Sequence, residues 1–303
     1  MTRAQFLRLA GGLATSAALA RLSPAMAAAA LPTRPIPSSG EPLPVVGCGT
    51  YRVFDVAQDS AEFAILPDVL AALFEAGGSV LDSSPMYGRA EAVLGSLLTA
   101  SNQRGRAFLA TKVWTTGRAA GIRQMEDSMK LLRTSRIDLM QIHNLLDWRT
   151  HLPVLREWQD QGRIRFVGIT HYTSSAYDEV EAVLKSERLD FLQINYSADD
   201  RAAAQRLLPL AAQRGVAVLV NRPFGGGGLL RRVMSRPLPP WAAEIGATSW
   251  AQLLLKFVLG HPAVTCVIPG TGRPAHMRDN VRAGLGELPG PDFWTRRLGD
   301  LQG

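Results

Sequence analysis

Short apolar segments rich in β-branched residues alternate with longer amphipathic segments from residue 43 onward. One apolar segment follows the next at intervals of roughly thirty residues, the length of a strand and a helix with their connections. Eight segments have strand character, and they cover residues 43–49, 79–82, 107–113, 137–143, 164–170, 190–195, 216–220 and 265–268. Helical periodicity covers residues 67–76, 90–98, 121–132, 152–161, 175–185, 201–214 and 250–259. The pattern predicts repeated βα units that build a parallel sheet.

Glycines support these boundaries. Gly77, Gly162 and Gly215 directly follow predicted helices, where a left-handed cap is expected. Eight strands with intervening helices over about 275 residues have the size of a closed barrel. A doubly wound open sheet alternates in the same way, but no Gly-x-Gly-x-x-Gly opens a helix after the first strand. The sequence therefore predicts an α/β fold, a single (β/α)8 TIM barrel over residues 31–303.

The N-terminal 30 residues differ in composition from the barrel. Arg3 and Arg8 precede an apolar stretch at 9–22, and the small-residue pattern Ala25-Met26-Ala27 follows it. This is the order of an export signal, with cleavage expected near Ala27. Two alternatives are a start site placed too far upstream and an amphipathic tail. A membrane anchor is less favoured because the stretch is short and contains an arginine, so no stable membrane insertion is expected after removal of the signal.

The string at residues 2–7 resembles a twin-arginine signal in which Ala4 replaces the second arginine. A twin-arginine route carries folded protein, which would suit an enzyme exported with its cofactor already bound. The sequence accordingly predicts a periplasmic protein, with a cytoplasmic location as the alternative.

Charge and cysteine content narrow the class further. The chain has a formal net charge of +7, and removal of residues 1–27 takes away three arginines and no acid. No basic stripe with interleaved aromatics is present, so nucleic-acid binding is not expected. Cys48 and Cys266 each lie in an apolar run and are expected to be buried packing residues. A disulfide is the less favoured alternative, and it requires that the first and last strands lie side by side.

Four polar residues fall at or just after predicted strand ends. Asp82 ends the second strand, Lys112 lies near the end of the third, and His143 ends the fourth. Tyr87 follows Asp82 by five residues, in the loop after the second strand. Alternation along the third strand places the small Ala110 beneath Lys112, which leaves room for an inward-pointing lysine. In a barrel the C-terminal strand ends converge on one mouth, so these side chains are predicted to meet there.

Together these residues suit the reduction of a carbonyl group. A carbonyl carbon that receives a hydride leaves an oxygen that must gain a proton. Tyr87 would be the acid, and because a free tyrosine has a pKa of about 10, the ammonium of Lys112 would lower it. Asp82 would anchor the lysine, and a neutral His143 would orient the carbonyl oxygen. Taken singly, each residue has an ordinary alternative: a turn-capping aspartate, a solvated lysine, a core histidine and a packed tyrosine.

Several motifs in order resemble those of the aldo-keto reductase superfamily across residues 43–283. They are Gly-Cys-Gly-Thr-Tyr at 47–51, Asp82 with Tyr87-Gly88, Thr-Lys-Val-Trp at 111–114, Gln-Ile-His-Asn at 141–144, Gly-Ile-Thr at 168–170, Gln-Ile-Asn-Tyr at 193–196, Val-Ile-Pro-Gly at 267–270 and Asp-Asn at 279–280. The resemblance implies that NADPH or NADH binds extended across the barrel mouth, that no metal takes part, and that a small aldehyde or ketone is the substrate. Tyr51, Trp114 and His143 are then expected to contact the substrate.

The resemblance also implies the cofactor-binding residues. These are Gly49, Thr50, Tyr51, Asp82, Thr170, His171, Gln193, Asn221, Pro223, Phe224, Gly225, Gly226, Gly270, Thr271, Arg273 and Asn280. Where the common pattern has Ser-Asn after the fifth strand, this chain has Thr170-His171. Asn221 stands where many members have a tyrosine that stacks on the nicotinamide.

The residues after the eighth strand bear on the choice of cofactor. Gly270 and His276 replace a lysine and an arginine of many members, which leaves Arg273 as the cation for a ribose 2′-phosphate. Arginine geometry suits phosphate, so NADP(H) is favoured and NAD(H) is the alternative.

A second hypothesis keeps the barrel but not the reaction: a cofactor-binding redox sensor or regulatory scaffold. The complete set of four strand-end residues argues against it, because a sensor needs no positioned proton donor. The sequence gives no indication of the physiological substrate or the oligomeric state.

Overall fold

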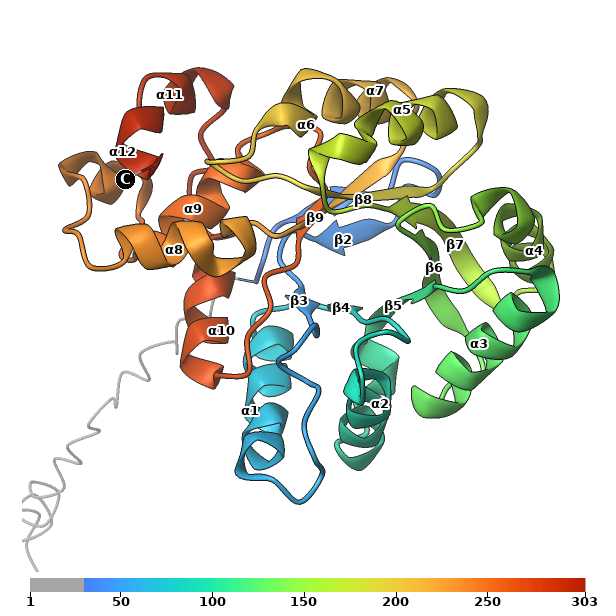
Figure 1. Cartoon of the computed structure of the whole chain (residues 1–303). Helices are drawn as coiled ribbons and strands as arrows, with labels where there is room; N and C mark the ends of the chain where they lie inside the picture. Colours follow the sequence, from blue (N-terminus) through green and yellow to red (C-terminus); the bar gives the residue numbers. More distant parts are fainter. Residues whose placement is uncertain (1–29, 303) are drawn as a thin grey trace, which may run out of the picture.

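The computed structural model describes residues 30–302, and the export signal predicted for residues 1–30 lies almost wholly outside them. Eight parallel strands form one sheet in the order β10-β9-β8-β7-β6-β5-β4-β3 (Figure 1). Two parallel bridges, Val46 to Val267 and Gly49 to Gly270, join the first strand to the last and close the ring. The strands are β3 (Cys48–Gly49), β4 (Val80–Asp82), β5 (Phe108–Val113), β6 (Ile137–His143), β7 (Ile164–Thr170), β8 (Phe191–Asn195), β9 (Ala217–Asn221) and β10 (Cys266–Val267). The predicted TIM barrel is confirmed.

Helices surround the barrel and alternate with its strands (Figure 1). They are α1 (Ala61–Glu75), α2 (Ala90–Ala100), α3 (Arg118–Leu131), α4 (Trp148–Asp160), α5 (Tyr177–Ser186), α6 (Ala202–Gln205), α7 (Leu207–Gln213), α8 (Gly228–Val233), α9 (Trp250–Leu259), α10 (Pro274–Arg282), α11 (Pro291–Thr295) and α12 (Leu298–Gln302). Among residues 30–302, none of the helices is long and apolar enough to cross a membrane.

A two-stranded hairpin precedes the barrel, and the sequence did not predict it. β1 (Thr33–Pro35) pairs antiparallel with β2 (Pro42–Pro44), so the strand predicted at 43–49 is divided between the hairpin and β3. The prolines explain the division, because proline lacks the N–H that an internal strand must donate. Ile36 and Leu43 of this hairpin are buried in the cluster that fills the barrel interior. The hairpin therefore closes the N-terminal end of the barrel.

Two predicted helices differ most from those in the structure, and those predicted at 121–132 and 152–161 begin three and four residues earlier, at Arg118 and Trp148. α1 begins at Ala61 rather than at Pro67, because the side chain of Ser60 caps it by accepting a hydrogen bond from the backbone N–H of Phe63 at 3.1 Å. The helix predicted at 201–214 is interrupted at Arg206, whose φ of −132° and ψ of −59° are not helical, and it forms α6 and α7.

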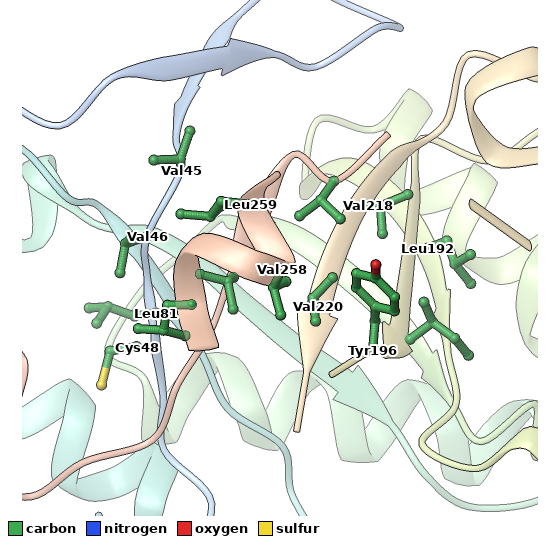
Figure 2. Close-up of a cluster of buried hydrophobic side chains, with 14 of the residues drawn as sticks. Val45, Val46, Cys48, Leu81, Leu192, Tyr196, Val218, Val220, Val258 and Leu259 are labelled. Carbon is green, nitrogen blue, oxygen red and sulfur yellow. The ribbon is translucent and has the colours of Figure 1, made fainter. Parts of the chain in front are cut away.

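The outward face of the sheet packs against the helices. In Figure 2, Val218 and Val220 of β9 lie beside Val258 and Leu259 of α9. These four side chains are fully buried, as expected for a parallel sheet covered by helices.

The two cysteines lie on opposite faces of the sheet. Cys48 belongs to the outer cluster (Figure 2), whereas Cys266 belongs to the cluster inside the barrel. Both are buried free thiols. The prediction that they are packing residues is confirmed, and the alternative of a disulfide is excluded by their facing different layers.

Three phenylalanines form an aromatic layer inside the barrel. The ring centroids of Phe108, Phe166 and Phe191 lie 5.5 to 6.0 Å apart. Side chains two positions further along each strand point in the same direction. On β5 the next inward residues after Phe108 are Ala110 and Lys112, so the polar groups of the site lie above this apolar layer.

Candidate active site

Asp82 and Lys112 form a buried ion pair at the ends of β4 and β5. The Nζ of Lys112 donates to Oδ2 of Asp82 at 2.8 Å and to the backbone oxygen of Ser83 at 2.6 Å. Oδ1 of Asp82 accepts hydrogen bonds from Nε2 of Gln141 at 3.1 Å and from Nε2 of Gln193 at 2.8 Å. Both carboxylate oxygens are therefore hydrogen-bonded, which a buried charge requires.

The environment keeps Lys112 protonated. Burial on its own lowers the pKa of Lys112, but the charges of Asp82 and Tyr87 and the hydrogen bonds to them raise it, and the net shift is upward. An ammonium is thus held at this position at neutral pH. Gln141, which sequence analysis quoted only as part of a motif, contributes to the same network through Asp82.

Tyr87 lies in the loop between β4 and α2, beside this ammonium. The Nζ of Lys112 is 5.0 Å from the centroid of the Tyr87 ring, and the ring of Tyr51 lies 4.9 Å away on a tilted plane. Burial raises the pKa of Tyr87, the charge of Lys112 opposes this, and the net shift is upward. Lys112 lowers the pKa of Tyr87, as expected, but burial raises this pKa by more. The phenol therefore keeps its proton at neutral pH.

His143, the last residue of β6, is 6% exposed and faces the same region. Its ring is 6.0 Å from that of Tyr87, edge to face, and 6.3 Å from that of Trp114. The Nδ1 atom lies 3.2 Å from the hydroxyl of Ser84. Ser84 was not among the predicted site residues, although it lies only two residues after Asp82.

The imidazole is neutral in this environment. Burial lowers the pKa of His143 to about 3, and the charges of Lys112 and His171 act in the same direction. The ring is therefore uncharged throughout the physiological pH range, as expected for a group that orients a carbonyl oxygen.

A cavity of about 660 Å³ opens at the C-terminal ends of the strands and brings these groups together. The predicted catalytic, cofactor and substrate residues that line this cavity are Gly49, Thr50, Tyr51, Asp82, Tyr87, Trp114, His143, Thr170, Gln193, Asn221, Pro223, Phe224, Gly226 and Gly270. Lining residues absent from that prediction are Arg52, Val53, Met86, Asn144, Tyr172, Arg222, Gly227, Ile268 and Pro269. Lys112 lies below the floor, where Asp82 holds it.

Residues 45–293 match the Aldo/keto reductase family. This chain belongs to that family. It is therefore an oxidoreductase that reduces carbonyl compounds, as the residues at the strand ends predicted. The match covers the barrel from β3 to α11.

Known aldo/keto reductases resemble the chain over most of its length. Methylglyoxal reductase YeaE of Escherichia coli is 29% identical over 247 residues, which are 79% of this chain and 84% of that protein. A Klebsiella pneumoniae aldo/keto reductase in complex with NADP and acetate has a TM-score of 0.72 at 25% identity, covering 87% of this chain and 93% of its own. An aldo-keto reductase from the same organism in complex with NADPH has a TM-score of 0.74 at 25% identity, covering 90% and 95% of the two chains.

Two predicted cofactor residues, after the fifth and seventh barrel strands, do not line the cavity. His171 lies behind Tyr172, with the two rings stacked at 5.6 Å and 6°, and its backbone oxygen accepts a hydrogen bond from Nδ2 of Asn221 at 3.0 Å. Gly225 packs against the carboxylate of Asp199. Tyr172, 47% exposed, lines the cavity in place of His171, and Phe224 is a second aromatic residue there close to Asn221 in the sequence.

Three predicted residues after β10 also lie outside the cavity lining. Thr271 accepts a hydrogen bond from the backbone N–H of Arg273 at 3.1 Å and shapes the turn into α10. The side chain of Arg273 is exposed at the N-terminal end of α10, and Asn280 is buried within this helix. These three residues lie along the loop after β10 and in α10, outside the lining of the cavity. The structure therefore does not bring them together with Asp82, Tyr87, Lys112 and His143.

The cavity suits an anionic dinucleotide. Among its lining residues Asp82 is the one acid, and Lys112 neutralises it, whereas Arg52 and Arg222 present guanidinium groups. The turn η4 (Gly225–Gly227) has positive φ at all three glycines, and its second and third members line the cavity. Glycine permits this turn and lets a ligand approach the backbone amides closely.

Two residues that line the cavity carry unpaired polar atoms. Within the part of the chain that the structure describes, Oδ1 of Asn144 and Oδ1 of Asn221 are buried without a hydrogen-bond partner. Buried polar atoms without partners are rare and tend to occur at functional sites. Among residues 30–302, no cluster of three or more His, Cys, Asp or Glu side chains is placed to hold a metal ion.

Proposed function

We propose that the protein reduces an aldehyde or ketone to an alcohol with NADP(H) as its cofactor, and that Tyr87 donates the proton. The observation that carries this proposal is the meeting of Tyr87, His143 and the Lys112–Asp82 ion pair at one cavity. Support comes also from the relatives: one is named as a methylglyoxal reductase, and two structures of similar fold contain NADP or NADPH.

The residues that would hold the cofactor lie near the C-terminal ends of four strands and on the loops after them. Thr50, Gln193 and Asn221 present polar groups to the cavity, and the amides of Gly226 and Gly227 would face the pyrophosphate. A reduced nicotinamide, when bound, supplies the hydride. The exposed Arg273 at the start of α10 is the residue that we assign to the ribose 2′-phosphate.

The proton comes from the protein. Tyr87 keeps its hydroxyl hydrogen at neutral pH and gives it to the carbonyl oxygen as negative charge develops there. The ammonium of Lys112, held by Asp82, stabilises the phenolate that remains. The neutral ring of His143 donates a hydrogen bond to the same oxygen and orients the carbonyl. Tyr51 and Trp114 give the substrate a partly aromatic wall.

The substitution Tyr87→Phe tests the proton donor. It removes one hydroxyl group and little volume, so we expect carbonyl reduction to be abolished while NADPH binding is nearly preserved. NADPH oxidation with a panel of aldehydes measures the first, and NADPH fluorescence titration measures the second. Tyr196→Phe is the matched control, because Tyr196 is buried in the outer hydrophobic cluster (Figure 2) and does not line the cavity. Substantial turnover by Tyr87→Phe would show that Tyr87 is not the acid. Absence of turnover in the native protein with every aldehyde would instead favour the sensor hypothesis.

We propose further that residues 1–27 direct export and that the mature protein is periplasmic. Support comes from the arginines at 3 and 8, the apolar stretch that follows them and the Ala-Met-Ala pattern at 25–27. Cell fractionation and N-terminal sequencing of the purified protein test this. A mature N-terminus near residue 28 in the periplasmic fraction is expected. A cytoplasmic protein with residue 1 intact would contradict it.

A further inference from the structure

A buried contact between Ser84 and His143 has no part in the reaction as described above. The hydroxyl oxygen of Ser84 lies 3.2 Å from Nδ1 of His143, and the two residues are 1% and 6% exposed. Ser84 is on the loop directly after β4, and His143 ends β6. His143 lines the cavity, whereas Ser84 does not. Nδ1 is therefore engaged behind the cavity wall, and the opposite edge of the ring, with Nε2, is the edge available to a ligand.

The surroundings of Ser84 determine the direction of this hydrogen bond. A serine hydroxyl has one hydrogen to donate and two lone pairs that accept. The backbone N–H of Met86 donates to the Ser84 oxygen over a long 3.4 Å, which leaves the hydroxyl hydrogen free to reach Nδ1. If Nδ1 carried the hydrogen instead, the oxygen would accept twice and its own hydrogen would have no acceptor. A buried donor without an acceptor is costly, so the arrangement in which Ser84 donates is favoured.

We propose that Ser84 is a positioning residue that fixes the tautomer of His143. With Nδ1 accepting from Ser84, the single hydrogen of the neutral ring is on Nε2, at the cavity edge. The ring then meets the carbonyl oxygen as a hydrogen-bond donor before any substrate binds. In the other tautomer, Nε2 would direct a lone pair at the carbonyl oxygen. This lone pair would repel the oxygen and could not orient the carbonyl group. The proposal rests on the reaction given under Proposed function, because His143 needs a defined tautomer only if it binds a substrate oxygen.

Histidine NMR tests the tautomer without turnover. In protein labelled with ¹⁵N at its five histidines, long-range ¹H–¹⁵N correlations distinguish a ring with hydrogen on Nε2 from one with hydrogen on Nδ1, and His143→Asn identifies the His143 signals. We expect the Nε2–H form alone in the native protein. In Ser84→Ala we expect the Nδ1–H form to appear and kcat to fall by about five- to tenfold, the order expected when a buried acceptor loses its donor. NADPH affinity should stay unchanged.

Two further variants separate this role from general packing. Ser84→Thr keeps a hydroxyl and should restore both the single tautomer and kcat. Ser128→Ala removes another buried serine hydroxyl, which donates to Glu91 at 3.1 Å, and it should alter neither.

Three results would overturn the proposal. The first is an Nδ1–H ring in the native protein, which can be measured even if Ser84→Ala fails to fold. The second is a Ser84→Ala protein with an unchanged tautomer, and the third is one with a changed tautomer but unchanged kcat. Failure of the proposed reaction can be distinguished from failure of the proposed role of Ser84. In that case Tyr87→Phe would keep full activity, and the tautomer of His143 measured by NMR would be unaffected.

Discussion

The substitution Asp82→Asn tests the ion pair on which the site is built. The side chains of Lys112 and Asp82 are 0% and 4% exposed, and their charged atoms are 2.8 Å apart. Asparagine has the same size but no charge, and its single oxygen cannot serve all three of the donors Lys112, Gln141 and Gln193. Loss of one partner of a buried pair costs about 3–5 kcal/mol, because the other charge remains buried without compensation. A domain of 150–250 residues loses about 2–4 °C in Tm per kcal/mol, so we expect Tm to fall by roughly 10 °C.

The pH dependence of this loss identifies Lys112 as its cause. In the native protein the charge of Asp82 raises the pKa of Lys112 against burial, so the stability contributed by Lys112 is present below its unfolded pKa and is lost above its folded pKa. Without Asp82 burial prevails, and the folded pKa falls below the unfolded value of about 10.4. On folding, Lys112 must then either lose its proton or be buried as a charged group without a partner. The Tm deficit of Asp82→Asn should therefore shrink as the pH rises toward about 10.

Thermal unfolding followed by circular dichroism at pH values between about 6 and 9.5 measures this change. The whole of this pH range lies below the pKa of lysine in the unfolded chain. Asp138→Asn is the matched control, because Asp138 is 7% exposed and paired with Arg165 at 2.9 Å, with no lysine involved. Its deficit should stay constant over this range, since arginine does not lose its proton there. An unchanged Tm in Asp82→Asn, or a deficit that grows with pH, would refute the reasoning.

Three other predictions follow from the site and the core. The pKa of His143 is about 3 and that of Tyr87 is raised, so neither group changes its protonation state near neutral pH. We therefore expect kcat/KM for reduction to be constant between about pH 5 and 8 and to fall only at the higher pH where Tyr87 loses its proton. A change in kcat/KM near about pH 6.5 would contradict a neutral His143. Arg273→Ser should raise KM for NADPH by about ten- to a hundredfold in steady-state assays and leave KM for NADH unchanged, since a charged hydrogen bond contributes about 1.5–3 kcal/mol. Equal effects on both KM values would assign the 2′-phosphate to another residue. Without reductant, a thiol reagent should detect no cysteine in the native protein and two in denaturant, and their absence in denaturant would reveal a disulfide.

The sequence predicted the parts of the structure that follow a simple period. Asp82, Lys112 and His143 lie where predicted strands end, and parallel strands in a barrel bring such ends to one mouth. Their meeting could be inferred because it depends only on strand position and alternation. The hairpin that closes the barrel could not be inferred in this way. In the sequence the apolar residues of 43–49 appear as one strand, whereas in the structure Pro42 and Pro44 belong to a separate hairpin strand.

The cavity wall was predicted less completely than the strand ends, because loops form much of it. Tyr172 and Arg222 are each next to a predicted residue, yet they reach the cavity while His171 turns away from it. Loop conformation decides which of two neighbours faces a ligand, and strand alternation gives no guide there. The backbone at Arg222 is also unusual, since its φ of 52° is left-handed, a conformation that a non-glycine residue seldom adopts.

The inward positions of the strands explain why the ion pair can exist at all. Ala110 lies beneath Lys112, and Gly168 of β7 lies beside Gln141, where an added Cβ would come within 3.2 Å of the Gln141 Cγ and 2.9 Å of the Phe191 backbone oxygen. Small residues at these points leave space for the lysine and for the glutamine amide that binds Asp82. The ion pair that supports proton transfer therefore depends on rigid strand positions, whereas Trp114 and Tyr172 lie just beyond strand ends. Substitutions at Trp114 and Tyr172 should alter which carbonyl compounds are reduced, whereas substitutions of Asp82 and Lys112 on the strands, or of Tyr87 on the loop after β4, should alter whether any is reduced.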